Sequence, residues 1–371
     1  MDEKRKLWIL VILAVVTVLL ILFFVFKDSL FFSPTANPEN CKVLEKNSEK
    51  GVNLVFLSDN KTAREYSDFL KTVSPFKENI DSFNFYYIDS YTPACTLYKG
   101  IALLCYNKEI IQKASACPND IIIIPQEKEN NIRSSSYMNV LSINSAQEKT
   151  VLIHEMGHAL ANLADEYVPA EIPKKSKNCQ KTCESFSVKE GCFLGCSKDS
   201  YYRSIDFGVM RTLATSKFGE LNQNIILEKI TSKSTSAITG NVISEQVETC
   251  SQEYILIQGN YNSGTLEIAS QSLETGCIPE VSSGDFEYEL SLEDNSTLSG
   301  EEFNPAFIFT DIQGENTLEG SVELSQENFY LMVPAIPHSE KLSIKENGNL
   351  IQTVDLTNSI QKLNSIPCKD E

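Results

Sequence analysis

The chain has 371 residues, which is too long for one ordinary domain and suits two domains, each able to bury a core. Its formal net charge is −18 at pH 7. Nucleic acids are bound by Lys and Arg side chains that neutralise phosphates, so this charge argues against a nucleic acid as the main partner.

The first predicted element is a membrane-spanning helix at residues 7–26, where Thr17 is the only polar residue. Twenty residues rise about 30 Å as a helix, enough to cross the hydrocarbon core of a membrane. The run is longer than the apolar part of a cleaved signal peptide, and no small-residue cleavage site follows it. Three basic residues in the segment 1–6 predict that this N-terminus is cytoplasmic. We therefore expect a single-pass protein of the cell membrane whose remaining chain is extracellular.

Strands and helices alternate in the next part of the chain. Residues 33–50 are polar, contain two prolines and are typical of a linker. Short apolar runs predict strands at 52–57, 83–89 and 120–125, and helical periodicity predicts a helix at 62–73. This alternation indicates an α/β (α+β) domain over residues 51–247.

The pattern changes at about residue 250 to short runs in which apolar and polar residues partly alternate. Asn347-Gly348 lies inside the last of these runs and predicts a tight hairpin turn, because that turn needs positive φ angles. We expect an all-β sandwich domain over residues 248–371.

The stretch "VLIHEMGHALANLADEY" at residues 151–167 contains the pattern H-E-x-x-H. On a helix, His154 and His158 lie one turn apart on one face, so both imidazoles can bind one metal ion. Glu155 beside them could take a proton from the water that attacks a peptide bond. The alternative is a chance pair of histidines on a buried helix.

A catalytic zinc site needs a third protein ligand, and the candidates are Asp165, Glu166 and the distant His338. In an unbroken helix, Asp165 would lie roughly 10 Å along the axis from His158, beyond reach of the same ion. The helix must therefore end between them, and Asn162 is a residue type that tolerates the left-handed conformation of such a break. We prefer Asp165 as the ligand. Glu166 is second and could instead orient a ligand.

The same stretch resembles the IgA-specific metalloendopeptidase family, whose hallmark is H-E-x-G-H, a glycine pair and L-A-D-E-Y. Ala161-Asn162 replaces the glycine pair here. The segments "VNLVFLSDNKTAREYSDFL", "CPNDIIIIP" and "YYRSIDFGVMRTL" extend the resemblance over roughly residues 50–215.

The resemblance implies a zincin-like catalytic domain with one catalytic Zn²⁺, bound by His154, His158 and Asp165, and with Glu155 as the catalytic residue. It also implies that Met210 forms an apolar floor beneath the metal. Residues 132–143 would be an edge strand to which the substrate adds. Tyr167 and Tyr202 are candidates to stabilise the oxyanion, although packing roles are the simpler interpretation for both.

All eleven cysteines follow the predicted membrane span, where an oxidising environment favours disulfides. The four residues Cys179, Cys183, Cys192 and Cys196 could bind zinc as thiolates or form two disulfides. We favour the disulfides Cys179–Cys196 and Cys183–Cys192. Cys250 and Cys277 are a further candidate pair.

The expected fold is thus an α/β (α+β) zincin-like catalytic domain followed by an all-β sandwich, with an N-terminal transmembrane helix. The expected function is a membrane-anchored, extracellular zinc endopeptidase whose partners are a protein or peptide substrate and the membrane. One alternative is a cell-surface binding or adhesion protein with an inactive metalloprotease-like domain. Another is a zinc hydrolase that acts on non-peptide cell-wall material.

Overall fold

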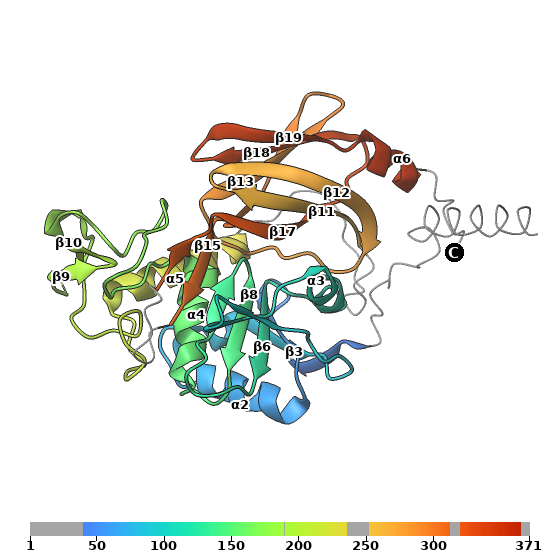
Figure 1. Ribbon diagram of the computed structural model, residues 1–371. Coiled ribbons are helices and arrows are strands. Elements are labelled where there is room, and N and C mark those ends of the chain that lie inside the picture. Colours follow the sequence, from blue (N-terminus) through green and yellow to red (C-terminus); the bar gives the residue numbers. More distant parts are fainter. Residues whose placement is uncertain (1–39, 189, 236–251, 312–319, 365–371) are drawn as a thin grey trace, which may run out of the picture. The chain divides into compact units, whose positions relative to one another are not determined.

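The computed structural model describes residues 40–188, 190–235, 252–311 and 320–364 (Figure 1). The described residues belong to one compact unit. Its centre is an eight-stranded sheet with the order β1 (Lys42–Glu45), β3 (Phe83–Tyr87), β2 (Val52–Phe56), β6 (Ile121–Gln126), β8 (Val140–Asn144), β7 (Ser135–Tyr137), β15 (Phe307–Thr310) and β16 (Val322–Glu323).

The four central strands β3, β2, β6 and β8 are parallel, and the strands outside them are antiparallel to their neighbours. Parallel strands need crossover connections. Helix α2 (Asn60–Leu70) connects β2 to β3, and the Asp59 carboxylate caps it by accepting a hydrogen bond from the backbone N–H of Thr62. A small hairpin, β4 (Thr96–Tyr98) and β5 (Ala102–Leu104), and helix α3 (Lys108–Ala114) lie between β3 and β6.

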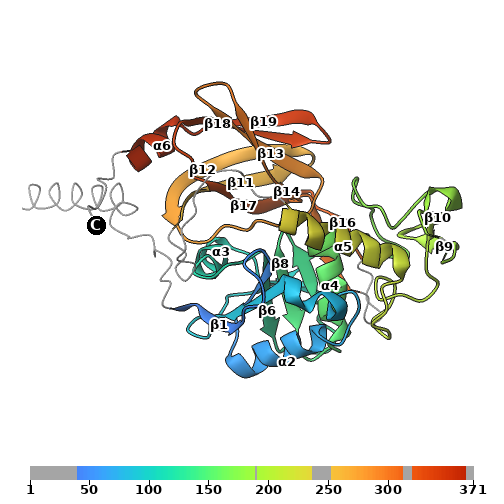
Figure 2. The same cartoon turned by 180° about the vertical axis from the view of Figure 1, so that it is seen from behind.

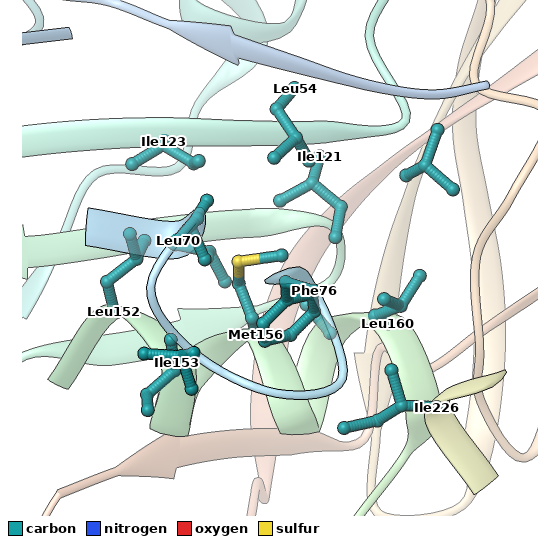
Figure 3. Packing of buried hydrophobic residues seen from close by; sticks show 14 of the residues in the cluster. Leu54, Leu70, Phe76, Ile121, Ile123, Leu152, Ile153, Met156, Leu160 and Ile226 are labelled. Atoms are coloured by element: carbon teal, nitrogen blue, oxygen red, sulfur yellow. The ribbon is translucent and has the colours of Figure 1, made fainter. Parts of the chain in front are cut away.

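The two faces of this sheet pack against different layers. Leu54 and Phe56 face a core that contains residues of α2, α4 (Thr150–Ala161) and α5 (Glu220–Thr235). Figure 3 shows side chains of this core, which include α4 residues such as Met156. Val55 and Leu57 face α3 and two strands of the C-terminal half. Helices α4 and α5 lie side by side (Figure 2).

The C-terminal half contains two antiparallel sheets. One has the order β12 (Thr265–Thr275), β11 (Glu253–Asn262), β17 (Gln326–Pro334), and the other β14 (Thr297–Phe303), β13 (Phe286–Leu292), β18 (Ser339–Glu346), β19 (Asn349–Asp355). Both contribute to one core, which includes Ile257, Phe286, Phe329 and Leu342. Asn347 and Gly348 have positive φ angles in the turn from β18 to β19, so the predicted hairpin is confirmed. Helix α6 (Thr357–Asn364) follows.

Four disulfides join described residues, and two of them are the predicted pairs Cys179–Cys196 and Cys183–Cys192. The other two are Cys41–Cys117 and Cys95–Cys105. The expected pairing of Cys250 with Cys277 involves Cys250, which lies outside the described residues. The two predicted bridges hold a loop with the short helix η3 (Cys183–Ser185) and the strands β9 (Phe193–Cys196) and β10 (Lys198–Arg203). Another short helix, η2 (Lys77–Ser82), precedes β3.

The predicted fold class was wrong. We expected an α/β (α+β) zincin-like domain followed by an all-β sandwich, with an N-terminal transmembrane helix. In the described part of the chain, strands take 36% of the residues and helices only 20%, so this part is mainly β. One contribution that the sequence did not indicate is a long-range pairing. The C-terminal half adds β15 and β16 to the sheet of the N-terminal half, and sequence periodicity cannot indicate which strands become neighbours.

The predicted location in the cell membrane was also wrong, judged by the helices that the structure describes. The expected membrane span at residues 7–26 lies outside the described residues. Among the residues that are described, no helix is both long and apolar enough to cross a membrane. The longest of these helices, α5, has 16 residues, and a transmembrane helix needs about 20 apolar ones. The single-pass location is therefore withdrawn, and the membrane as a partner stays an untested prediction.

Candidate metal centre

Helix α4 brings His154 and His158 together. All of its residues from Val151 to Ala161 are buried, because its apolar side chains pack on the central sheet. The two imidazole rings are one turn apart and meet edge to face, with centroids 4.8 Å apart. Between them, a Cβ atom on Gly157 would lie 2.7 Å from the sulfur of Met210. Met210 therefore packs closely against this turn, and its role as a floor beneath a metal stays a prediction.

The helix ends at Asn162, which has φ 48° and ψ 36° in the left-handed region. Its N–H donates to the carbonyl of His158, and the N–H of Leu163 donates to the carbonyl of Gly157. These bonds satisfy carbonyls at the end of the helix, as is usual where the chain turns through a left-handed residue. The predicted break at Asn162 is confirmed. It returns the chain so that Asp165 faces the two histidines.

His154, His158 and Asp165 form a close triangle of ligand atoms. The Nε2 atoms of the histidines are 3.2 Å apart, and Oδ1 of Asp165 lies 3.2 Å from the first and 3.3 Å from the second. A tetrahedral zinc ion with ligands at about 2.0–2.1 Å would hold them about 3.3 Å apart. The three side chains therefore have the spacing that a zinc ion requires.

Hydrogen bonds at the far side of each ring indicate which nitrogen carries the proton. Nδ1 of His154 lies 2.9 Å from the carbonyl oxygen of Val209, and Nδ1 of His158 lies 2.6 Å from that of Leu163. A carbonyl oxygen only accepts, so each Nδ1 donates its proton. When both rings are neutral, the Nε2 lone pairs of the two histidines and the Asp165 oxygen point toward one another. Only a cation or an added proton can then bridge these three acceptors.

Without a bound cation, a proton would take this place. Burial disfavours the charged form of His154, but the hydrogen bond and the charge of Asp165 outweigh burial and raise the pKa of His154 to about 9. Burial lowers the pKa of His158. Burial would raise the pKa of Asp165, but His158 and His154 hold that pKa far below its usual range. The site thus favours an anionic carboxylate that faces a positive charge.

Two other segments hold Asp165 in position. Its Oδ2 accepts hydrogen bonds from the N–H of Ser321, at 2.7 Å, and from the Ser321 hydroxyl. Its carbonyl accepts a hydrogen bond from the hydroxyl of Ser197, at 2.6 Å. Ser197 follows Cys196, whose disulfide with Cys179 packs against Ala164. Because Ser321 engages Oδ2, Oδ1 stays directed at the histidines.

Glu155 is fully buried beside this group, and neither of its carboxylate oxygens has a hydrogen-bond partner among the described residues. Burial raises the pKa of Glu155 well above its ordinary value. His154 opposes this effect, while Asp311 and Asp165 add to it. Burial of a charged carboxylate without hydrogen-bond partners is energetically unfavourable. The surroundings of Glu155 therefore favour its protonated form.

Asp311 is a third buried carboxylate at the site, after Asp165 and Glu155, and the sequence did not indicate it. It follows β15, and its Oδ2 accepts a hydrogen bond from the N–H of Ser134 at 3.1 Å. Burial raises the pKa of Asp311 to about 6, although the charge of His154 acts in the opposite direction. The only feature of the sequence that could have indicated Asp311 is its position, as an acidic residue directly after an apolar run. Nothing local indicates that this run lies beside the metal ligands, and the same holds for Ser321.

Glu166 and His338, the other candidates for the third ligand, are engaged elsewhere. Oε1 of Glu166 accepts hydrogen bonds from the amides of Asn222, at 2.8 Å, and Asn178, at 3.2 Å. Burial raises the pKa of Glu166 to about 7, although both amides act against this. His338 is exposed in a turn and lies 3.0 Å from a Glu293 oxygen. The geometry therefore favours Asp165.

The two tyrosines proposed for the oxyanion differ in position. The ring of Tyr167 lies parallel to that of His154, and its hydroxyl donates to the carbonyl of Thr310 at 2.6 Å. Tyr202 lies in β10, where its backbone pairs with Gln180. No hydrogen bond joins Tyr202 to the metal ligands within the described ranges. Only Tyr167 lies at the site, and its hydroxyl is already engaged.

The predicted substrate-binding edge at residues 132–143 requires a correction. This segment contains β7, which lies between β8 and β15 and is therefore not a free edge. In the pairing with β15, Ser135, Ser136 and Tyr137 lie opposite Thr310, Phe309 and Ile308. The Phe309 ring stacks on the His158 ring, with centroids 4.3 Å apart. A strand of the C-terminal half thus covers both β7 and the metal ligands.

Substitution of Asp165 and of its neighbour Glu166 should show which of the two acids binds the metal. Asp165→Asn removes the charge that faces the two histidines, so we expect zinc affinity to fall at least about 100-fold. Glu166→Gln is the matched control and should keep zinc affinity within about threefold, because a glutamine oxygen can still accept from both asparagines. Competition with a chromogenic chelator measures both constants. Equal losses in the two variants would contradict the assignment of Asp165.

The same control variant gives a pH test. The pKa of Glu166 is about 7 in the folded protein, against an ordinary value of 4.5. The folded chain therefore holds this proton more tightly than the unfolded chain, and the contribution of Glu166 to stability falls as pH rises from about 4.5 to about 7. Glu166→Gln removes this loss. Relative to wild type, the variant should gain up to about 3 kcal/mol of unfolding free energy between pH 4.5 and 8 in urea titrations. A stability difference that does not change with pH would refute this.

A comparison of the chain with protein-family models and with curated proteins finds no match. The resemblance to the IgA-specific metalloendopeptidase family therefore stays a prediction, based on the motifs quoted above.

Proposed function

We propose that this protein is a zinc-dependent endopeptidase. One observation carries the proposal: the three ligand atoms of His154, His158 and Asp165 lie 3.2–3.3 Å apart, beside the unpartnered carboxylate of Glu155. Two histidines and a carboxylate form a ligand set known for catalytic zinc, which keeps a further position open for water or substrate. The H-E-x-x-H pattern on a helix is typical of metalloproteases.

A zinc ion held by these residues would polarise the peptide carbonyl and lower the pKa of water to about 7. The protein's own contribution is to place and orient the groups. The carbonyls of Val209 and Leu163 fix the rings of His154 and His158, while Ser321 fixes the carboxylate of Asp165. Such partners keep ligands in place during a reaction.

Glu155 would move the proton. Its carboxylate takes a proton from the attacking water and later gives it to the nitrogen of the leaving amine. Two features support this role. Both oxygens lack partners among the described residues, and burial raises the pKa of Glu155, which strengthens its hold on a proton. A group that first accepts and then donates a proton needs such an affinity at neutral pH.

A second candidate is a binding protein whose metalloprotease-like part is inactive. One observation favours it: Glu155 and Asp165 are 0% exposed and the two histidines 1%, so the site is closed to a large ligand. A metal bound there would then be purely structural. In an enzyme, turnover would depend on Glu155. In a binding protein with a structural metal, there would be no turnover for Glu155 to affect.

Glu155→Gln provides the decisive variant. We expect the zinc-loaded wild type to release new peptide N-termini from a denatured protein mixture, and Glu155→Gln to do so at least about 100-fold more slowly, because the amide cannot accept the proton. Zinc content should stay at one ion per chain in both proteins. Glu148→Gln is the matched control: it is the same substitution, on an exposed residue just before α4, and should retain activity. Full activity in Glu155→Gln would refute the proposal.

A further inference from the structure

The strand β15 lies against the part of the sheet that is nearest to the metal ligands. It pairs antiparallel with β7 through Ile308, Phe309 and Thr310. It also lies beside α4, which carries both histidines (Figure 1). Without β15 and β16, β7 would be the outermost strand on this side of the sheet. A strand in this position leaves no free backbone groups of β7 for another chain.

The same segment touches the metal centre at several points. The ring of Phe309 stacks on His158, and the carbonyl of Thr310 accepts a hydrogen bond from Tyr167. Asp311, just after β15, contributes its charge beside Glu155. These contacts place β15 directly beside the metal ligands, where a peptide close to the metal would also have to lie.

Burial leads to the same conclusion. Peptide hydrolysis requires the scissile carbonyl close to the metal and to a water that Glu155 can reach, about 3 Å away. Glu155 is 0% exposed, and Phe309 above the ligands is 4% exposed. The conformation with β15 in place is therefore closed to a protein substrate.

We propose that β15 occupies the position of the substrate strand, and that a peptide binds antiparallel to β7 only after β15 has left it. This inference rests on the proposed endopeptidase function. The sequence of β15 indicates the class of substrate. We expect an extended peptide with a large apolar or aromatic side chain in the position of Phe309, stacked on the His158 ring. Strand addition of this kind uses main-chain hydrogen bonds for affinity and alternate side chains for specificity.

The ladder that joins β15 to the sheet is short, while its side chains Phe307, Ile308 and Phe309 are held by burial. The strand has three paired positions on β7 and two on β16, whereas β11 has nine on β17. Proteins open locally at free energies below that of global unfolding, and a strand with few ladder bonds is a place where such opening can begin. The peptide then binds to the fraction of molecules in which β7 is free, and its apparent affinity is reduced by that fraction.

The test is the affinity of zinc-loaded, full-length protein for a peptide hydroxamate, Phe-Ile-Phe-NHOH, measured by calorimetry. Phe309→Ala removes the ring that stacks on His158, so it should bind the hydroxamate at least about tenfold more tightly than wild type. Phe329→Ala is the matched control, because it removes a buried ring of the same core that packs on Phe303 and not on a metal ligand. It should bind like wild type.

A second variant adds atoms instead of removing them. A Cβ on Gly320 would lie 2.4 Å from the Tyr167 ring and hydroxyl, and the carbonyl of Gly320 accepts a hydrogen bond from Thr310. Gly320→Ala should therefore loosen the segment and tighten hydroxamate binding in the same direction. Amide hydrogen exchange at residues 307–310 should become faster when the hydroxamate binds to wild type. If Phe309→Ala fails to fold or to hold zinc, Gly320→Ala decides.

The possible failures are distinguishable. Equal hydroxamate affinity in wild type and in the folded variants, or slower exchange at residues 307–310, would overturn the role of β15. If instead the variants bind the hydroxamate tightly but cleave no peptide of the Phe-Ile-Phe-Thr type, β15 is a displaceable cover and the proposed endopeptidase function is wrong.

Discussion

The site depends on the convergence of three atoms that all carry lone pairs. Two imidazole nitrogens and one carboxylate oxygen lie 3.2–3.3 Å apart in a place without solvent exposure. Acceptors this close repel one another unless a positive charge lies between them, and burial increases the cost of leaving them unpaired. The surrounding structure is built to hold this arrangement. Two backbone carbonyls fix the rings, and a serine from the other half of the chain fixes the carboxylate.

The helix break at Asn162 is the local feature that makes the triangle possible. A continuous helix would carry Asp165 away from the histidines, whereas one left-handed residue turns the chain back to them. The Cys179–Cys196 disulfide and Ser197 then support the returning segment. The cysteine-rich loop therefore stabilises the metal centre from outside, without contributing a ligand.

Interactions between residues close in sequence could be predicted, and those between distant segments could not. The spacing of His154 and His158, the left-handed Asn162 and the nested disulfides at 179–196 all follow from local geometry, as do the strands β2, β3 and β6. The sequence did not indicate that β15 and β16 join the N-terminal sheet from more than 150 residues away. Ser321 and Asp311 were missed for the same reason. Strand periodicity indicates which face of a strand is buried, but it does not identify the neighbouring strand.

The pairing of β15 with β7 links the C-terminal half to the proposed chemistry, because one short strand both covers the ligands and leads to the segment that orients Asp165. The proposed chemistry requires a zinc ion bound by His154, His158 and Asp165. Diffraction data from zinc-loaded crystals above and below the zinc absorption edge test this most directly. The account predicts one anomalous peak about 2 Å from Nε2 of His154, Nε2 of His158 and Oδ1 of Asp165. No peak at this place, or a peak whose third protein ligand is Glu166 or Asp311, would contradict it.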